Sequence, residues 1–189
     1  MFMSDFLTPK EIKKLSLKSY GKNLKISRNV ILINPKKISI GNNVRIDAFT
    51  IITAKNYKIT LGNYIHIGVG CYINGSYGVE INDYAGLSTG SKILTSSDDY
   101  SGNFMTNPTV PDQYTNAKNE KVTLKKYVNI GANSIIMPGV NISEGAVVGV
   151  FSFVPKNLKP WSIYFGIPVK KIAERKKKLL KFSSKITHE

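Results

Sequence analysis

The chain has 189 residues, and its 27 Lys and Arg residues against 12 Asp and Glu residues give a formal net charge of +15. Such a charge indicates an anionic partner, which would be nucleic acid, an acidic membrane surface or a phosphorylated small molecule. A hydrophobic content of 42% excludes a disordered basic chain and favours one domain with a sizeable core, while no apolar run approaches the roughly 20 residues that span a bilayer.

The start of the chain and its cysteine content indicate the compartment. Residues 1–6 lack the basic segment followed by an apolar stretch that is typical of a secretory signal. The single cysteine, Cys71, cannot form an intrachain disulfide, which fits a reducing environment. We therefore expect a cytoplasmic protein.

Residues 1–23 are expected to form an N-terminal cap helix. Thr8-Pro9-Lys10-Glu11 has the pattern of a capping box, with Thr8 as the N-cap and Glu11 reaching back to it. The helix is predicted to run to about Tyr20, and Gly21 is placed to end it. Its apolar side chains would cover the open end of the following structure: Ile12, Leu15 and Leu17.

Residues 24–169 carry an internal repeat with a period of six. The repeats begin with an aliphatic residue at these positions: Ile40, Ile46, Leu61, Ile67, Ile81, Leu87, Ile130, Ile142 and Val148. Four residues later stands a small or β-branched side chain, with one Ile among them: Val44, Thr50, Ile65, Cys71, Ala85, Ser91, Ser134, Ala146 and Ser152. Such a period fits neither an amphipathic helix nor a simple two-faced strand, and it predicts an all-β solenoid of short strands and turns around an apolar interior.

One long interruption divides the repeat. Residues 96–121 have no six-residue pattern and contain two prolines, so we expect an extended loop inserted in the solenoid. A loop of this length in a compact domain is more often functional than decorative.

Residues 170–189 are expected to form a basic C-terminal helix and tail, with the helix from about Lys170 to Phe182. Charge runs of this kind are usually solvated helix faces, so Lys176-Lys177-Lys178 is interpreted in that way.

The hexapeptide repeats, together with Gly166-Ile167-Pro168-Val169-Lys170-Lys171 after the last coil, resemble the left-handed β-helix acyltransferases. That family includes maltose and galactoside O-acetyltransferases and nucleotide-amino-sugar N-acetyltransferases. The resemblance covers roughly residues 24–172 and implies a left-handed parallel β-helix, a homotrimer, and an acyl-CoA bound along the groove between neighbouring prisms. It further implies that the loop at 96–121 folds over the acceptor, where several side chains would contact a sugar or a base: Tyr100, Phe104, Asn107 and Tyr114. Alternatively, Phe104 and Tyr114 anchor the loop to the prism.

Acyl transfer needs a base for the acceptor and a means of holding the tetrahedral oxyanion. The chain has two histidines, and His188 lies next to its last residue. His66 ends the repeat that begins at Leu61, at a turn where its side chain can face the groove, so it is the candidate base. A purely structural role for His66 is the alternative.

The chain departs from the maltose-type pattern after Ile93-Leu94-Thr95, because Asp98 stands about where those enzymes carry the catalytic histidine. Asp98 or Asp99, in the same or a neighbouring subunit, would orient His66. Alternatively, one of these carboxylates binds the acceptor while the amine loses its proton to the substrate or to the thioester sulfur. A third possibility is that the pair only starts the loop by capping a turn.

The resemblance also assigns residues to coenzyme A. Backbone groups of two successive coils would bind the pantetheine arm: Ala132, Ser134, Gly149 and Ser152. Pro168, Lys170 and Lys171 match the family's motif after the last coil, where cations bind phosphate. Trp161 would line the adenine end or pack under the C-terminal helix.

The sequence thus predicts an acyl-CoA-dependent transferase and favours acetyl as the acyl group. The acceptor favoured is the amino group of a dTDP- or UDP-activated deoxyamino sugar for surface polysaccharide such as O-antigen. The alternative is an O-acetyltransferase for a galactoside or glycan hydroxyl. No metal-ligand cluster is expected, and two histidines argue against a three-histidine metalloenzyme of the same fold.

The distribution of charge argues against a nucleic-acid partner. Residues 1–58 carry 12 basic and 3 acidic side chains, residues 59–169 carry 7 of each, and residues 170–189 carry 8 and 2. A nucleic-acid interface would place basic residues among aromatic ones on one surface, whereas the middle of this chain is neutral.

Overall fold

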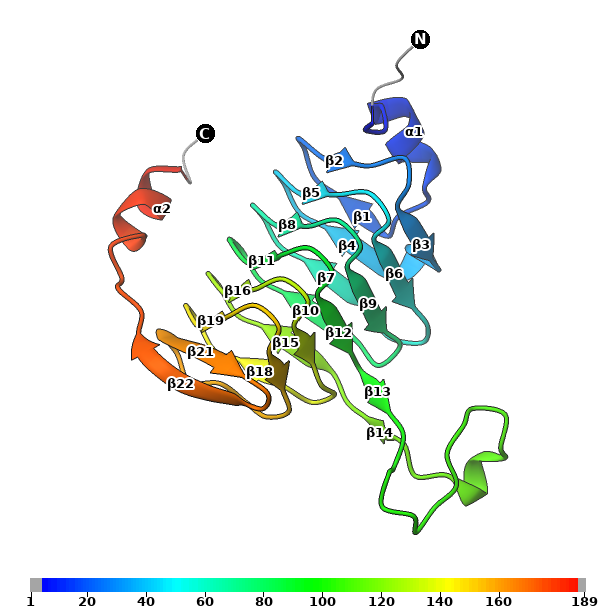
Figure 1. The fold of residues 1–189 in the computed structure, drawn as a ribbon. Coiled ribbons are helices and arrows are strands. Elements are labelled where there is room, and N and C mark those ends of the chain that lie inside the picture. The colour runs from blue at the N-terminus through cyan, green and yellow to red at the C-terminus, as the bar shows by residue number, and fades with distance from the viewer. Residues whose placement is uncertain (1–4, 187–189) are drawn as a thin grey trace.

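The computed structural model describes residues 5–186, which form a parallel β-solenoid with three faces (Figure 1). Successive coils stack so that each short strand pairs with its equivalent one coil later (Figure 1). This confirms the all-β solenoid expected from the six-residue period.

Each face is one sheet, in which all neighbouring strands are parallel except the last two of face two. Face one has the strand order β1 (Ser19–Tyr20), β4 (Ile38–Ile40), β7 (Ile59–Leu61), β10 (Val79–Ile81), β15 (Val122–Leu124) and β18 (Asn141–Ile142). Face two has the order β2 (Lys25–Ile26), β5 (Arg45–Ile46), β8 (His66–Ile67), β11 (Gly86–Leu87), β16 (Asn129–Ile130), β19 (Val147–Val148), β21 (Ser162–Gly166) and β22 (Val169–Glu174). Face three has the order β3 (Ile31–Ile33), β6 (Ile51–Ala54), β9 (Tyr72–Gly75), β12 (Lys92–Leu94), β17 (Ile135–Ile136) and β20 (Phe153–Val154).

The core is the inside of the prism. All nine repeat leaders and all nine fifth-position residues named above are buried, and most of the short strands contribute one or two aliphatic side chains to a continuous apolar column. Burial of one such side chain contributes about 1.5–3 kcal/mol, and the polar fifth residues lie at corners where they bond to backbone. Thr50 and Ser91, for example, donate to the carbonyls of Gly68 and Gly131.

The N-terminal cap is a helix as expected, but a shorter one. α1 spans Pro9–Lys14 and begins with the predicted capping box, and its Ile12 is buried. Ser16 has a φ of 55°, so this residue and not Gly21 turns the chain out of the helix. The chain then enters β1, which lies before the expected start of the solenoid at residue 24.

The C-terminal segment differs from the expectation of a helix over 170–182. Val169–Glu174 is strand β22, which pairs antiparallel with β21 and so extends face two. The helix α2 begins later and spans Leu180–Ile186. The exposed edge of the last coil binds these residues as a strand, because backbone pairing there outweighs their local helix preference.

Residues 96–121, here called the arm, leave the solenoid at the corner between faces three and one. The arm begins with an antiparallel ribbon, β13 (Ser96–Ser97) with β14 (Lys118–Asn119), and holds a short 3₁₀ turn, Asp112–Tyr114. It points away from the chain's own prism (Figure 1). Within one chain the arm does not line the groove over face two, so the expectation that it folds over the acceptor site stays a prediction.

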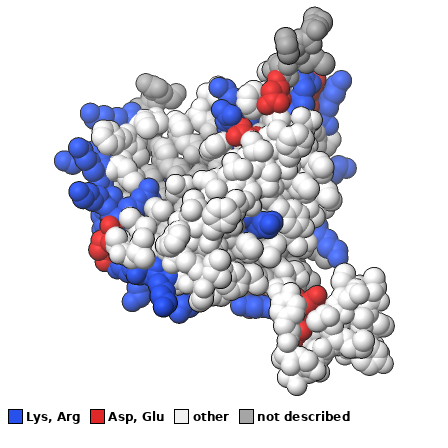
Figure 2. All heavy atoms as spheres, in the orientation of Figure 1, with Lys and Arg blue, Asp and Glu red and all other residues white. Residues whose placement is uncertain are grey.

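Charge follows the distribution found in the sequence. Figure 2 shows Lys and Arg gathered over the C-terminal elements and around the N-terminal end, with few charges on the middle coils that face the viewer. No helix within residues 5–186 is long and apolar enough to cross a membrane.

Candidate active site

The outward side of face two carries one side chain per coil in a straight row. Strand register aligns these positions: Lys25, Arg45, His66, Gly86, Asn129 and Val147. Gly86 has no side chain, so the row is hollowed between His66 and Asn129. A Cβ added at Gly86 would meet Asn129 Oδ1 at 3.4 Å and the His66 carbonyl oxygen at 3.6 Å, which are ordinary contact distances, so a methyl group would fit there.

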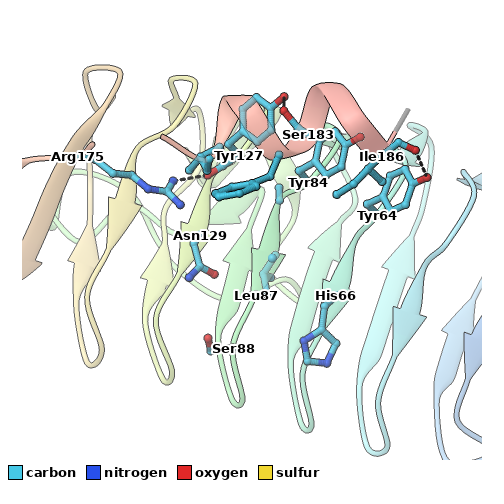
Figure 3. Close-up of a pocket in the computed structure, with 14 residues that line it drawn as sticks. Tyr64, His66, Tyr84, Leu87, Ser88, Tyr127, Asn129, Arg175, Ser183 and Ile186 are labelled. Atoms are coloured by element: carbon cyan, nitrogen blue, oxygen red, sulfur yellow. Dashed lines mark hydrogen bonds between the residues drawn. The ribbon is translucent and has the colours of Figure 1, made fainter. Parts of the chain in front are cut away.

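A groove of about 430 Å³ lies over this part of face two and under α2 (Figure 3). His66, Ser88 and Asn129 lie on the sheet side, and Leu179 and Phe182 line it from the C-terminal segment. A second hollow of about 350 Å³ continues it toward the N-terminal coils and shares Tyr64 and His66 with it. His66 therefore lies where the two cavities meet.

His66 is held by a carboxylate one coil earlier. Its Nε2 lies 2.8 Å from Oδ2 of Asp47, and Nε of Arg45 donates to Oδ1 of Asp47 at 2.6 Å. Burial would raise the pKa of Asp47, but the hydrogen bonds from His66 and Arg45 together hold it below its ordinary value. Because the ionised carboxylate only accepts, Nε2 of His66 carries the proton, and the Nδ1 lone pair is left to accept one.

A stack of aromatic rings forms the wall beneath α2. Tyr64, Tyr84 and Tyr127 occupy the same corner in successive coils, with ring centroids 4.9 and 5.2 Å apart and nearly parallel planes. The hydroxyls at both ends of the stack bind α2, Tyr64 to the Ile186 carbonyl at 3.4 Å and Tyr127 to Ser183 Oγ at 2.9 Å (Figure 3). The stack thus fixes α2 over the groove.

Arg175 connects the stack to the segment that precedes α2. Its guanidinium donates to the carbonyls of Tyr127 at 2.6 Å and Gly145 at 3.1 Å. Burial lowers the pKa of Arg175, but both carbonyls keep the cation bonded.

Asp98 and Asp99 do not meet His66 of the same chain. Both begin the arm, and neither lines the groove. Asp99 accepts from Ser101 N at 2.7 Å and from Asn116 Nδ2 at 3.1 Å, and these bonds, Ser101 first, lower its pKa. Within one chain, Asp99 therefore stabilises the arm through hydrogen bonds inside it, and the carboxylate that contacts His66 is that of Asp47.

The four aromatic and amide residues expected to contact the acceptor also lie on the arm. Tyr100 is 82% exposed, and Phe104 and Tyr114 are 45% and 54% exposed. Asn107 accepts from Thr109 N with its side-chain oxygen. None of the four lines the groove of the same chain.

The residues expected at the pantetheine arm lie at the corner between faces two and three. Ser134 and Ser152 are buried, and their hydroxyls bond the corner internally, Ser134 to the Gly149 carbonyl at 2.8 Å and Ser152 to that of Val150 at 3.2 Å. Ala132 and Gly149 are partly exposed. The backbone N of Gly149 donates to Tyr164, so this amide is already used within the coil.

The remaining expected coenzyme A residues lie beyond the last coil. Trp161 packs against Tyr127 with centroids 6.1 Å apart, and the Lys177 ammonium lies 5.4 Å from its ring centroid. Trp161 therefore caps the aromatic stack. Pro168 begins the turn into β22, and Lys170 and Lys171 lie exposed on that strand, where Lys171 pairs with Glu174.

Sequence reasoning missed several groove residues. Asp47 directly follows the leader Ile46, and Arg45 stands in register with His66, so a coil-by-coil alignment would have brought the three together. Tyr64, Tyr84 and Tyr127 share another signal, since each precedes a fifth-position residue. Ser88, like Asp47, stands directly after the leading aliphatic residue of its repeat.

Comparison with known proteins decides the family. The dTDP-4-amino-4,6-dideoxy-D-glucose acyltransferase of Escherichia coli is 42% identical over 95% of this chain and 93% of its own length. The chain belongs to this acyltransferase family. The N-acyltransferase AntD from Bacillus cereus, solved in complex with dTDP and 3-hydroxybutyryl-CoA, is 44% identical with a TM-score of 0.94 and covers 98% of this chain and 97% of that one.

A more distant relative is the galactoside O-acetyltransferase of Lactococcus lactis, 29% identical over 57% of this chain and 51% of its own length. No protein-family model matches the chain. The expectation of an acyltransferase is confirmed, and the amino-sugar branch is more similar to the chain than the galactoside branch.

Proposed function

We propose that the protein transfers an acyl group from an acyl-CoA to the amino group of a dTDP-4-amino-4,6-dideoxyhexose. The observation that carries this proposal is similarity over almost the whole chain to two enzymes named for that chemistry, at 42% and 44% identity. O-acylation of a galactoside or glycan is the weaker candidate, because the relative named for it matches less of the chain.

The groove over face two supports a simple route for the reaction. The ammonium of the sugar gives a proton to Nδ1 of His66, and Asp47 balances the imidazolium through Nε2. The free amine attacks the thioester carbonyl, so that an N–C bond forms. The nitrogen of the tetrahedral intermediate loses its second proton to water. The C–S bond then breaks, and the imidazolium gives its proton to the sulfur of the leaving coenzyme A.

The tetrahedral intermediate needs donors for its oxyanion. We assign this role to two neutral donors that line the groove, the hydroxyl of Ser88 and the amide of Asn129 (Figure 3). The rival account leaves His66 structural and passes the proton from the amine to the thioester sulfur.

We assign coenzyme A to the C-terminal half of the groove. Ala132 and Gly149 lie at the corner that would follow the pantetheine arm, and the Lys170 and Lys171 ammonium groups would meet its phosphates. The acyl chain proposed is acetyl or a short hydroxyacyl group, the latter because AntD was solved with 3-hydroxybutyryl-CoA.

We propose that a second copy of the chain completes the acceptor half of the site. The arm points away from its own prism, so in a homotrimer Asp98, Asp99 and the exposed rings of Tyr100 and Tyr114 would reach a neighbour's groove. The outward row of face three is mostly apolar, and Ile31 is 52% exposed there, which favours burial against another copy. We propose a cytoplasmic reaction, because the proposed substrates are an activated sugar and an acyl-CoA.

The experiment offers dTDP-4-amino-4,6-dideoxyglucose and a galactoside to the purified protein, each with acetyl-CoA and with 3-hydroxybutyryl-CoA. We expect thiol release only with the amino sugar, and a product whose mass shows one added acyl group. Burial raises the pKa of the Cys71 thiol to about 11, so it should contribute little background to a thiol-reactive dye. Transfer to the galactoside without transfer to the amine would refute the proposal.

A further inference from the structure

A separate cavity of about 590 Å³ lies at the corner between faces three and one, at the base of the arm. Its walls carry three ammonium groups and two phenol rings, from Lys37, Lys58, Lys121, Tyr57 and Tyr77. It shares no lining residue with the groove under α2. The cavity is therefore a distinct feature of the chain, and nothing in the acyl transfer described above uses it.

The cavity concentrates positive charge that the protein does not neutralise. The pKa of Lys18 is lowered, with the neighbouring Lys58 as the largest cause and burial and Lys37 adding to it. Glu80 is the one carboxylate on the wall, and it is already paired with Lys121. Among the ion pairs of residues 5–186, none involves Lys37 or Lys58.

Like charges gathered around one cavity repel each other in the free protein. An anion between them would convert repulsion into attraction, and several ammonium groups around one hollow suit the adjacent charges of a diphosphate. A single surface lysine would give no such preference.

The aromatic side of the cavity adds a second requirement. The rings of Tyr57 and Tyr77 lie 5.8 Å apart between centroids and are tilted by 32°. Tyr57 is 54% exposed, so one ring face is free to stack on a planar group. A ligand that combines a diphosphate with a planar base can contact both the lysines and the tyrosine rings. The volume of the cavity lies within the range of small-molecule sites.

We propose that this pocket binds a nucleoside diphosphate, with the phosphates on Lys37 and Lys58 and the base on Tyr57. Two sources share this chemistry, namely a free nucleotide and the nucleotide end of the acceptor, held for the groove of a neighbouring copy. The proposal does not depend on the role of His66 in acyl transfer, and it is tested by measurements of binding.

The test uses calorimetric titration of the full-length protein with dTDP and with inorganic pyrophosphate, on wild type and on the double variant K37A/K58A. We expect affinity for both probes at this site to fall by at least about tenfold in the double variant, because the charge-assisted contacts are lost. Y57A should weaken dTDP and leave pyrophosphate unchanged, since only the base needs the ring. The matched control is K13A/K14A, which removes the same charge from exposed lysines of α1.

A second readout guards against misfolding of the variants. Without added anion at low salt, K58A should melt above wild type, because the repulsion with Lys18 is removed, and pyrophosphate should raise the melting temperature of wild type more than that of K37A/K58A. Equal loss of affinity in K37A/K58A and K13A/K14A, or no loss in either, would overturn the proposal while leaving acyl transfer untouched.

Kinetics with the dTDP-sugar distinguish the two sources. A raised KM for the acceptor in K37A/K58A, with kcat retained, identifies the acceptor's own nucleotide as the ligand. Loss of one dTDP site without a change in that KM identifies a free nucleotide.

Discussion

At the scale of single residues, substitutions of His66 and of Asp47 are expected to lower kcat to different extents. His66→Asn removes the proton acceptor and should lower kcat by about 10²–10⁴-fold with little change in KM. Asp47→Asn keeps the shape but removes the charge that balances the imidazolium, so a smaller loss of kcat is expected. Steady-state thiol release at saturating acyl-CoA measures both. Near-normal turnover of His66→Asn would assign the proton to the thioester sulfur instead.

Glu11 gives a pH-dependent contribution to stability whose direction is fixed by its contacts. A hydrogen bond from Arg28, and then bonds from Thr8, lower the pKa of Glu11 from 4.5 to about 2. The folded state therefore binds a proton less readily than the unfolded state, and the stabilisation is complete above 4.5 and lost as the pH falls to about 2.

The matching variant is Glu11→Gln, whose melting temperature should lie below that of wild type at neutral pH. The gap should narrow between pH 4.5 and about 2 and close at lower pH. Glu144→Gln is the control, because Glu144 is exposed and forms no ion pair within residues 5–186. A gap that stays constant down to pH 2 would contradict this role of Glu11.

Gly86 is expected to serve the groove and not the fold. A Cβ there meets its nearest neighbours at ordinary contact distances, whereas one at Gly131 would lie 2.5 Å from backbone of the next coil. Gly86→Ala should therefore leave the free energy of unfolding within about 1 kcal/mol of wild type and lower kcat/KM, while Gly131→Ala should destabilise the coil. Unchanged kcat/KM in Gly86→Ala would place the reacting atoms elsewhere. Denaturant unfolding and initial rates separate the two effects.

The sequence pointed to His66 by elimination, because a chain with two histidines offers few bases. It did not point to Asp47, since the partner lies one coil away and its distance depends on how the coils stack. For Ser134 and Ser152, the sequence pattern was present but fitted two different roles. The fifth position of the repeat predicts that they are small, and small residues suit both a pantetheine groove and a buried corner, where the structure puts them.

At the scale of elements, the aromatic stack and α2 form one unit. Tyr64, Tyr84 and Tyr127 all have φ between 56° and 62°, a region that costs an L-residue energy and favours glycine. Three aromatic residues in this conformation, in three successive coils, need compensation, and the stacked rings and the contacts with α2 supply it.

The middle tyrosine makes this argument testable. Among the described residues, Tyr84 Oη is buried without a hydrogen-bond partner, and burial raises the pKa of this phenol. Tyr84→Phe should therefore raise the free energy of unfolding by about 1 kcal/mol, whereas Tyr127→Phe should lower it by a similar amount because the bond to Ser183 is lost. Equilibrium denaturation of both variants decides. Equal destabilisation by the two changes would mean that the Tyr84 hydroxyl has a partner.

Local sequence patterns located the N-terminal helix better than the C-terminal one. Thr8 and Glu11 define the start of α1 through side-chain contacts within four residues, which a sequence displays directly. The segment that was expected to be helical from Lys170 pairs instead with β21, and this depends on an unpaired strand edge elsewhere in the chain. Charge and helix preference alone carry no information about that edge.

At the scale of the whole molecule, the six-residue period predicted the fold because every coil repeats the same local problem. One aliphatic side chain fills the prism and one small residue fits the corner, so sequence and burial agree along the solenoid. No such repeat in the sequence predicts the direction of the arm. Its length indicated function, but only the three-dimensional structure shows that it leaves its own prism (Figure 1).

If the arm completes a neighbour's groove, two inactive variants should restore each other. His66→Asn damages the groove and keeps the arm, while Asp98→Ala damages the arm and keeps the groove. In trimers reassembled from an equal mixture, about a quarter of the sites would pair an intact arm with an intact groove. The thiol-release rate of the mixture should then exceed that of either variant by a large factor. Mixing without reassembly is the control, and a reassembled mixture no more active than its parts would mean that each chain completes its own site.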